Sequence, residues 1–226
     1  MRIFRKIGDK LFYRGGIFHP TKPFSLKWQN DLETAIREGK KIINIGAGPY
    51  QRPGTISIDP GYRREDKWHI KAFGENLPFK DNSIDFAICS AVLQYIKEPI
   101  RVVDEIYRIL KPGGRIYTDI VFLFPSSSSA LRGYNDYNRM TLDGLECLCR
   151  KFKRIESGAG LGVNSAIARI LVEYGQIFFR NRFLKKIARN ITKIIVSPLK
   201  YFDRLLVNNK EMINLAGGVY FYGEKR

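Results

Sequence analysis

The residues best suited to chemistry lie where two strand-like segments end. Residues 42–48, Ile-Ile-Asn-Ile-Gly-Ala-Gly, form an apolar run that enters a glycine turn, and residues 55–59, Thr-Ile-Ser-Ile-Asp, form a second run that ends in an acid. Gly46 and Gly48 lack Cβ, so the backbone can turn sharply there and approach a ligand closely. Asp59 can accept two hydrogen bonds from a ribose diol. The pairing predicts a nucleoside-cofactor pocket, although a glycine turn also ends many strands that bind nothing.

Two features argue against the nicotinamide-dinucleotide version of this pattern. That fingerprint is G-x-G-x-x-G, with its acidic residue about 20 positions further on. Here position 51 is Gln, and Asp59 follows Gly46 by only 13 residues. An NAD-dependent dehydrogenase is therefore excluded.

Two later segments make the pattern more specific. Residues 75–95 begin Glu-Asn-Leu-Pro-Phe-Lys-Asp-Asn-Ser-Ile-Asp, and residues 108–118 read Arg-Ile-Leu-Lys-Pro-Gly-Gly-Arg-Ile-Tyr-Thr. In this order after a glycine-ended strand, they resemble the class I S-adenosylmethionine-dependent methyltransferases, in the subgroup with Leu-Pro-Phe and Leu-Lys-Pro-Gly-Gly segments. The resemblance covers roughly residues 41–157. It implies a Rossmann-like fold, S-adenosyl-L-methionine as cofactor and methyl transfer as activity.

The resemblance also implies which residues hold the cofactor. Asp59 would bind the ribose hydroxyls. Gly46, Ala47 and Gly48 would pass beneath the methionine and ribose portions, Phe73 and Gly74 would border the adenine, and Ser90 and Ala91 would face the methionyl part. Relatives often carry an acid or Asn at the position of Phe73. Either Phe73 packs against the base or Glu75 supplies the polar contact, and an ordinary core aromatic remains the alternative for Phe73.

The acceptor side departs from the family pattern at Leu93-Gln94-Tyr95, where relatives commonly read Leu-Glu-His. Without that histidine the easiest general base is missing. Residues 133–141 resemble an Asp-Tyr-x-Arg-x-Thr segment of a glycan-linked branch of the family. The catalytic candidates are Tyr95 and Asp136 as base or hydrogen-bond acceptor, with Tyr134, Tyr137 and Arg139 gripping a polar or phosphorylated acceptor. The alternative is structural: Thr141 caps the next helix, and Asp136 pairs with Arg139 within the loop.

Alternating apolar patterns predict an α/β fold with a mostly parallel, Rossmann-like, seven-stranded sheet. The strands are expected near residues 42–46, 55–59, 69–73, 84–90, 114–121, 152–157 and 218–223, and helices near 25–38, 98–110 and 141–151. Only residues 47–54 join the first two strands, so the first crossover helix must be shortened or lost. The last strand is expected to run antiparallel and, from its position at the chain end, to lie at the sheet edge.

Charge and periodicity suggest four parts of the chain. They are a basic helical extension at 1–40 with an amphipathic segment at 2–13, a cofactor-binding domain at 41–164, a basic helical insertion at 165–216, and the last strand at 217–226. The net charge is +17, of which +5 lies in residues 1–40 and +8 in residues 165–210. Basic flanks favour a polyanionic partner, unless they are only a solvated face. The insertion is expected to form either a lid over the acceptor site or a peripheral contact with an anionic membrane surface.

Composition excludes several classes of protein. The chain has 226 residues, three cysteines and two histidines, with no metal-ligand spacing, so neither a disulfide framework nor a metal site is expected. No apolar run reaches the length of a transmembrane helix, and a cytoplasmic location is expected, with peripheral membrane association open. The favoured acceptor is a hydroxyl of a sugar or glycan precursor, either a small molecule or lipid-linked. A quinone-like or other small aromatic acceptor and a non-catalytic cofactor-binding scaffold remain alternatives, and no nucleic-acid partner is expected.

Overall fold

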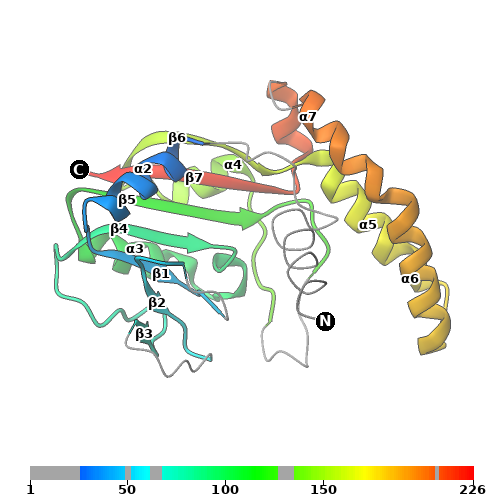
Figure 1. The fold of residues 1–226 in the computed structure, drawn as a ribbon, viewed down its shortest axis with the longest axis horizontal. Helices are drawn as coiled ribbons and strands as arrows, with labels where there is room; N and C mark the ends of the chain where they lie inside the picture. Colours follow the sequence, from blue (N-terminus) through cyan, green and yellow to red (C-terminus); the bar gives the residue numbers. More distant parts are fainter. Residues whose placement is uncertain (1–25, 49–51, 62–67, 127–134, 207–208) are drawn as a thin grey trace. The chain divides into compact units, whose positions relative to one another are not determined.

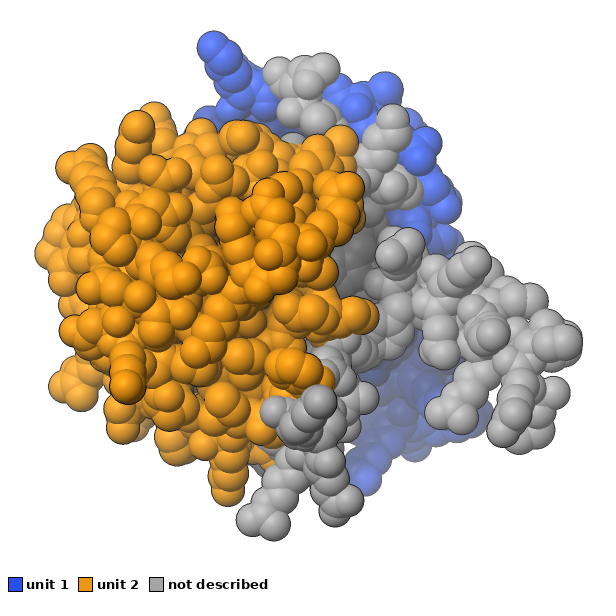
Figure 2. Space-filling view, turned by 60° about the vertical axis from the view of Figure 1, so that its left-hand side comes forward, with its two compact units in different colours: residues 1–24, 122–126, 159–218 blue, residues 25–121, 127–158, 219–226 orange. Residues whose placement is uncertain are grey.

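The computed structural model describes residues 26–48, 52–61, 68–126, 135–206 and 209–226. The chain divides into two compact units (Figure 2). Unit 2 comprises residues 25–121, 127–158 and 219–226, and unit 1 comprises residues 1–24, 122–126 and 159–218. The helix expected at residues 2–13 lies outside the described residues.

A seven-stranded sheet in the order β3-β2-β1-β4-β5-β7-β6 forms the framework of unit 2 (Figure 1). Strands β1 to β5 pair in parallel, and β7 runs opposite to β5. The order reverses at β1, which pairs with β2 on one side and β4 on the other, and ligands of open α/β sheets bind outside the carboxyl ends at such a switch point. The predicted fold class is confirmed. The strand bounds are β1 Ile42–Ile45, β2 Ile56–Ile58, β3 His69–Ile70, β4 Ile84–Ser90, β5 Leu110–Val121, β6 Phe152–Leu161 and β7 Gly218–Lys225.

The expected edge position of the last strand is wrong, because β7 lies between β5 and β6. Its first six residues, 218–223, are all buried. A strand covered on both faces reads as a continuous apolar and aromatic run, without polar alternation. Val219-Tyr-Phe-Tyr222 has that pattern, so burial, rather than position at the chain end, predicts where the strand lies.

Helices α2 (Lys27–Arg37), α3 (Pro99–Ile109) and α4 (Leu142–Leu148) belong to unit 2, close to their predicted positions. Helix α3 begins with proline, whose missing N–H costs nothing at a first helical position. Thr141 caps α4, as predicted, because its side-chain oxygen accepts a hydrogen bond from the Gly144 amide at 3.2 Å. Between β1 and β2 the described residues form turns and no helix, in keeping with the short crossover.

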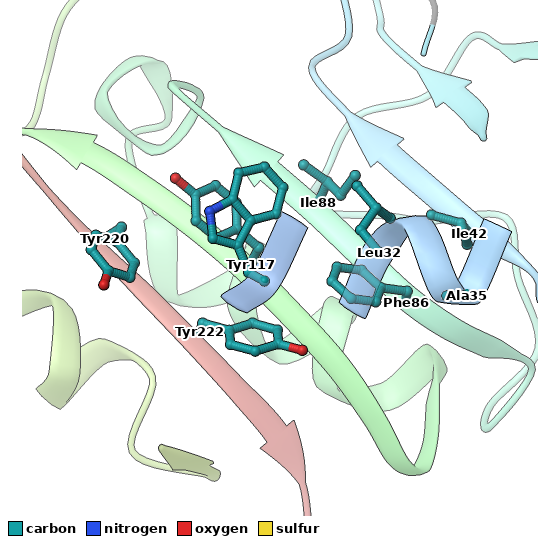
Figure 3. Packing of buried hydrophobic residues seen from close by; sticks show 9 residues of the cluster. Leu32, Ala35, Ile42, Phe86, Ile88, Tyr117, Tyr220 and Tyr222 are labelled. Carbon is teal, nitrogen blue, oxygen red and sulfur yellow. The ribbon is translucent and has the colours of Figure 1, made fainter. Parts of the chain in front are cut away.

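Helix α2 covers one face of the sheet with residues spaced by four and three, Trp28, Leu32 and Ala35. These pack on side chains of β1, β4, β5 and β7 (Figure 3), with the Trp28 ring stacked on Tyr117 at a centroid distance of 3.8 Å. Helix α3 meets the other face. A Cβ added at Gly74 would lie 3.2 Å from Val102 of α3 and 3.3 Å from Ile45 of β1, so both side chains reach that point.

A single arginine joins the two motif segments on which the resemblance rests. Arg108 donates to the carbonyl oxygens of Leu77 and Phe79 at 3.1 and 2.9 Å, and it pairs with Glu105 and Asp81. Glu105 in turn accepts the Leu77 amide at 3.0 Å. Hydrogen bonds from Arg108 lower the pKa of Glu105, which keeps that carboxyl charged. Helix α3 therefore fixes the Leu-Pro-Phe segment that leads into β4.

Unit 1 is built on an antiparallel pair of helices, α5 (Val163–Ile177) and α6 (Arg182–Val196), followed by a short α7 (Asp203–Leu206). Ala168 and Val172 of α5 pack against Val196 of α6. The buried Asp203 carboxylate accepts the amides of Asn164 and Ser165 and the Ser165 hydroxyl, at 2.8, 3.2 and 2.6 Å. An acid at a helix N-terminus satisfies free amides and complements the helix dipole, so α7 secures the start of α5.

Tyr222 offers a test of how α2 is held on the sheet. Its hydroxyl donates to Asp31 of α2 at 2.7 Å and accepts from Arg115 of β5 at 3.0 Å. Burial, and then the bond to Asp31, raises the pKa of Tyr222 above its ordinary value, so its contribution to stability is complete below about pH 10 and declines above it. We expect Tyr222→Phe to lower the free energy of unfolding by about 1 kcal/mol near neutral pH and to flatten the alkaline decline. Denaturant titrations from neutral to alkaline pH, with the exposed Tyr174→Phe as control, measure both effects; an unchanged alkaline slope would contradict the assignment.

Candidate active site

The glycine turn after β1 has the backbone that the sequence predicts. Gly46 and Gly48 have φ of 65° and 54°, in the left-handed region that side-chain-bearing residues rarely adopt. A Cβ on Gly46 would lie 2.2 Å from Cγ2 of Val92, whereas a Cβ on Gly48 would meet nothing within 4 Å. Gly46 is therefore required for packing, and Gly48 borders open space that a ligand can approach.

Asp59 follows β2 and is 6% exposed. Its Oδ2 accepts the Gly48 amide and its Oδ1 accepts the Gly61 amide, each at 2.9 Å. The carboxylate thus ties together the loops at the carboxyl ends of β1 and β2. A carboxylate oxygen has two lone-pair sites, so one carboxylate can accept more hydrogen bonds than these two.

The segment after β3 places an exposed ring and a buried carboxyl oxygen side by side in the chain. The Phe73 side chain is 64% exposed, so its reading as an ordinary core aromatic is wrong. Gly74 is buried against α3 and β1. Glu75 Oε2 is buried without a hydrogen-bond partner among the described residues. A buried carboxylate oxygen is costly to leave unpaired, so this atom has an unused capacity to accept a hydrogen bond.

Sequence reasoning missed Asp119, near the carboxyl end of β5. Its Oδ2 accepts the Ser90 hydroxyl at 2.6 Å, and its Oδ1 accepts the Ala91 amide at 2.8 Å. Ala91 has φ of 55°, so Asp119 stabilises an unfavourable backbone conformation directly after β4. Burial and then the Asp119 charge raise the pKa of Cys89 to about 12, which leaves that thiol protonated. An acid at the end of one strand, in register with a serine at the end of its neighbour, was the available signal.

The predicted acceptor segment lies against the 3-10 turn η1 (Leu93–Tyr95) that follows β4. The Gln94 carbonyl accepts the amides of Tyr137 and Asn138, and the Asn138 side chain donates to the Ile96 carbonyl. Gln94 itself is 2% exposed, and its Oε1 has no hydrogen-bond partner within the described chain. Gln94, which lies in the segment where relatives read Leu-Glu-His, therefore anchors the backbone of the acceptor segment.

Asp136 and Arg139 form a two-point ion pair in this segment, one bond of which measures 2.7 Å between Arg139 Nη2 and Asp136 Oδ2. The Asp136 side chain is 1% exposed and that of Arg139 is 29% exposed. The bond to Asp136 raises the pKa of Arg139, so the guanidinium keeps its charge. The pairing predicted as the structural alternative does form. Tyr134 lies outside the described residues.

Two cavities on the described surface of unit 2 lie away from these residues. One, of about 420 Å³, borders the end of α2 and the Lys111-Pro-Gly-Gly114 turn, and the other, of about 700 Å³, borders residues 39–42 and 53–56. Both lie at the amino ends of the strands. The site is therefore assigned from the glycine turn and the acids at the carboxyl ends, where ligands of this sheet type bind. Among the residues with described positions, no cluster of metal-binding side chains occurs.

Comparisons with known proteins agree with this geometry. Residues 61–118 match the family model described as a methyltransferase domain. These residues therefore belong to an S-adenosylmethionine-dependent methyltransferase domain. Its fold resembles that of a Galdieria sulphuraria protein described as a sarcosine dimethylglycine methyltransferase, with a TM-score of 0.52, 12% identity, and coverage of 88% of this chain and 84% of that one.

Curated relatives of this methyltransferase domain match over part of the chain. An uncharacterized protein of Methanocaldococcus jannaschii is 32% identical over 54% of this chain and 62% of its own length. A demethylmenaquinone methyltransferase of Paenarthrobacter aurescens is 31% identical over 40% of this chain and 43% of its own. The chain thus spans less than two thirds of the length of either relative, and the shared part identifies the domain without identifying the acceptor.

Proposed function

We propose that the protein transfers a methyl group from S-adenosyl-L-methionine to a hydroxyl of a sugar or glycan precursor. The observation that carries the cofactor half of the proposal is the glycine turn bound to Asp59, at the point where the strand order reverses. The polar acceptor segment on η1 supports the hydroxyl acceptor.

The residues at the strand ends fit this cofactor. Gly48 leaves open space beside its backbone, Asp59 offers carboxylate lone pairs to a ribose diol, and Glu75 presents an unpaired oxygen for the adenine amino group. Phe73 is exposed and can cover the base. Ser90 and Ala91, positioned by Asp119, would border the methionyl portion.

The cofactor supplies an electrophilic methyl carbon on a sulfonium, so the protein must mainly align the acceptor oxygen and exclude water. On methyl transfer the acceptor hydroxyl would lose its proton, which a side chain of the protein or solvent would take up. Tyr95 and the Asp136–Arg139 pair are the candidate groups for holding the acceptor and receiving that proton. Arg139 keeps its charge, which suits a hydroxylated or phosphorylated acceptor.

A quinone-like acceptor is the second candidate, because one relative is a demethylmenaquinone methyltransferase. That relative matches only 40% of this chain. The match therefore bears on the methyltransferase domain more than on the acceptor. An acceptor of this kind would need an apolar, aromatic cavity, and the described acceptor segment offers a buried ion pair and amide groups instead.

Labelled methyl transfer tests these proposals together. The full chain is incubated with S-adenosyl-L-methionine labelled in its methyl group and with three acceptor sets: nucleotide sugars, lipid-linked sugars and demethylated quinones. Label in a sugar fraction supports the proposal, and label only in quinones supports the second candidate. Cofactor binding in calorimetry without transfer to any set would indicate a non-catalytic scaffold.

The Asp136–Arg139 pair provides a sharper test of the acceptor assignment. Asp136→Ala alone would leave the partly exposed Arg139 without its buried partner, and we expect a loss of about 1–3 kcal/mol in stability. The double variant Asp136→Ala/Arg139→Ala removes both charges, so it should fold almost normally and bind cofactor as the wild type does. With the acceptor found above, we expect it to lose at least about 100-fold in turnover if the pair aligns the acceptor. Full turnover in a folded double variant would show that the pair only stabilises the loop.

A further inference from the structure

Exposed apolar side chains are concentrated in unit 1. Of the 23 large hydrophobic residues that are exposed in the described chain, 16 lie between Ile167 and Leu205. Several are almost fully open to solvent, including Ile177 at 73%, Ile194 at 74% and Leu205 at 77%. Contiguous exposed apolar surface is uncommon and usually marks an interaction site.

In α6 the exposed apolar residues form a stripe that the helix does not use for internal packing. With about 100° between successive residues, they span an arc of roughly 120°. Val196 and Thr192 face α5 instead, since Val196 is buried with Ala168 and Val172, and Thr192 would contact a Cβ at Gly175. The stripe of α6 consists of Phe183, Leu184, Ile187, Ile191, Ile194 and Ile195.

Helix α5 carries a matching stripe, formed by Ile167, Ile170, Leu171, Tyr174 and Ile177. On each helix, the centre of the stripe lies about 130° around the helix axis from the residues that contact the other helix. Viewed from the N-terminus of each helix, this rotation has the same sense in both helices. Because α5 and α6 are antiparallel, both stripes face the same side of the pair. Together they form one apolar surface, the α5–α6 apolar face.

The opposite side of α6 is basic. Its polar arc carries Arg182, Lys185, Lys186, Arg189 and Lys193, and none of the five forms an ion pair with an acid in the described part of the chain. Residues 163–196 contain seven basic side chains and one acid, Glu173, which pairs with Arg169 at 2.7 Å. A helix with isoleucine and phenylalanine on one face and Lys/Arg on the other has the composition of an interfacial membrane helix.

We propose that the α5–α6 apolar face docks on an anionic lipid bilayer, with both helices lying in the interface. No described helix is long and apolar enough to span a bilayer, so the contact would be peripheral. Long lysine and arginine side chains reach around a helix toward lipid headgroups while the apolar stripe enters the acyl boundary. The positive charge of the two helices favours acidic lipid as the occupant over a second copy of the chain, because an anionic surface attracts the basic side chains, whereas a second copy supplies no opposite charge. This inference does not depend on the proposed methyl transfer.

Vesicle co-sedimentation of the full chain tests the proposal. We expect binding to vesicles of phosphatidylcholine with about 30% phosphatidylglycerol, little binding to phosphatidylcholine alone, and release as salt rises through the range where the Debye length falls below about 8 Å. Absence of binding to the acidic vesicles at low salt would overturn the proposal.

Two sets of variants separate the apolar and electrostatic parts. Ile177→Ser/Ile194→Ser/Ile195→Ser and Lys185→Gln/Lys186→Gln/Arg189→Gln should each weaken vesicle binding at least about tenfold. The control for the isoleucine variant changes exposed apolar residues elsewhere, in Leu26→Ser/Ile100→Ser/Leu215→Ser. The control for the basic variant changes exposed lysines elsewhere, in Lys71→Gln/Lys80→Gln/Lys153→Gln. Both controls should bind vesicles as the wild type does. Thermal melting checks that every variant folds.

Three results would contradict membrane docking. Wild-type binding by the isoleucine variant would mean that the apolar face does not enter the bilayer. Equal losses in the basic variant and its charge-matched control would indicate non-specific attraction. A dimer seen in size-exclusion chromatography of the wild type and lost in the isoleucine variant would assign the face to a second copy of the chain.

Discussion

Replacing Asp59 with alanine is expected to weaken binding of S-adenosyl-L-methionine at least about tenfold. Each hydrogen bond from a ribose hydroxyl to a carboxylate contributes roughly 1.5–3 kcal/mol, and about 1.4 kcal/mol corresponds to a factor of ten in affinity. The variant also leaves the Gly48 and Gly61 amides without their acceptor, so the loops after β1 and β2 should loosen. Isothermal titration with S-adenosyl-L-methionine and with its demethylated product measures the loss.

Controls distinguish the role of Asp59 from a general change in charge. Glu33→Ala removes an exposed acid from α2 and should leave affinity unchanged. Asp59→Asn keeps one acceptor oxygen and should give an intermediate affinity. If Asp59→Ala folds and binds both compounds with wild-type affinity, the carboxylate serves only to join the two loops.

The sheet was largely predictable from the sequence because each strand is a short apolar run bounded by turn residues. Strand β4 lies where the pattern places it, at Ile84–Ser90. Strand β5 begins earlier than expected, at Leu110, because Leu110 already pairs with Ile84 of β4. The Lys111-Pro-Gly-Gly segment is an irregularity in the register before the next pair, Arg115 with Phe86. The expected edge position of β7 is wrong because a place at the chain end does not decide a place in the sheet. The continuous apolar and aromatic run of the strand is the better indicator, and it matches the burial of β7.

The site divides into local and non-local parts. The glycine turn and Asp59 could be predicted because their roles follow from backbone conformation and position at a strand end. Asp119 left only a weak signal in the sequence, an acid near the end of an expected strand, since its bonds to Ser90 and Ala91 span 29 and 28 residues and exist only once β4 and β5 pair in register. The exposure of Phe73 was equally inaccessible, because a phenylalanine beside a buried glycine gives no sign in sequence of which way it points.

The α5–α6 pair shows where periodicity alone is ambiguous. Apolar residues at helical spacing usually mark a face that packs against the rest of the protein. Here Ala168, Val172 and Val196 make the helix–helix contact, while the more prominent isoleucines are exposed. The pattern predicted the helices correctly, and only the structure distinguishes the packing face from the open one.

Gly46→Ala is expected to abolish measurable cofactor binding and to destabilise unit 2. The new Cβ would lie 2.2 Å from Cγ2 of Val92, in a backbone conformation with φ of 65°. The left-handed conformation alone costs roughly 1–2 kcal/mol, and the clash must be relieved by moving either η1 or the turn that carries Gly48. Calorimetry and denaturant unfolding measure the two losses separately.

Matched glycine variants separate clash, backbone strain and blocked ligand space. Gly39→Ala, with φ of 67° and nothing within 4 Å of its Cβ, should lose only the strain energy and keep its cofactor affinity. Gly48→Ala has similar strain and similar free space, but its methyl group would project beside the proposed cofactor, so affinity should fall while stability matches Gly39→Ala. Adding Val92→Ala to Gly46→Ala removes both Cγ atoms and should restore most of the stability. If the Gly46 variant binds cofactor normally, or if Gly48→Ala binds as Gly39→Ala does, the turn after β1 is not the cofactor site.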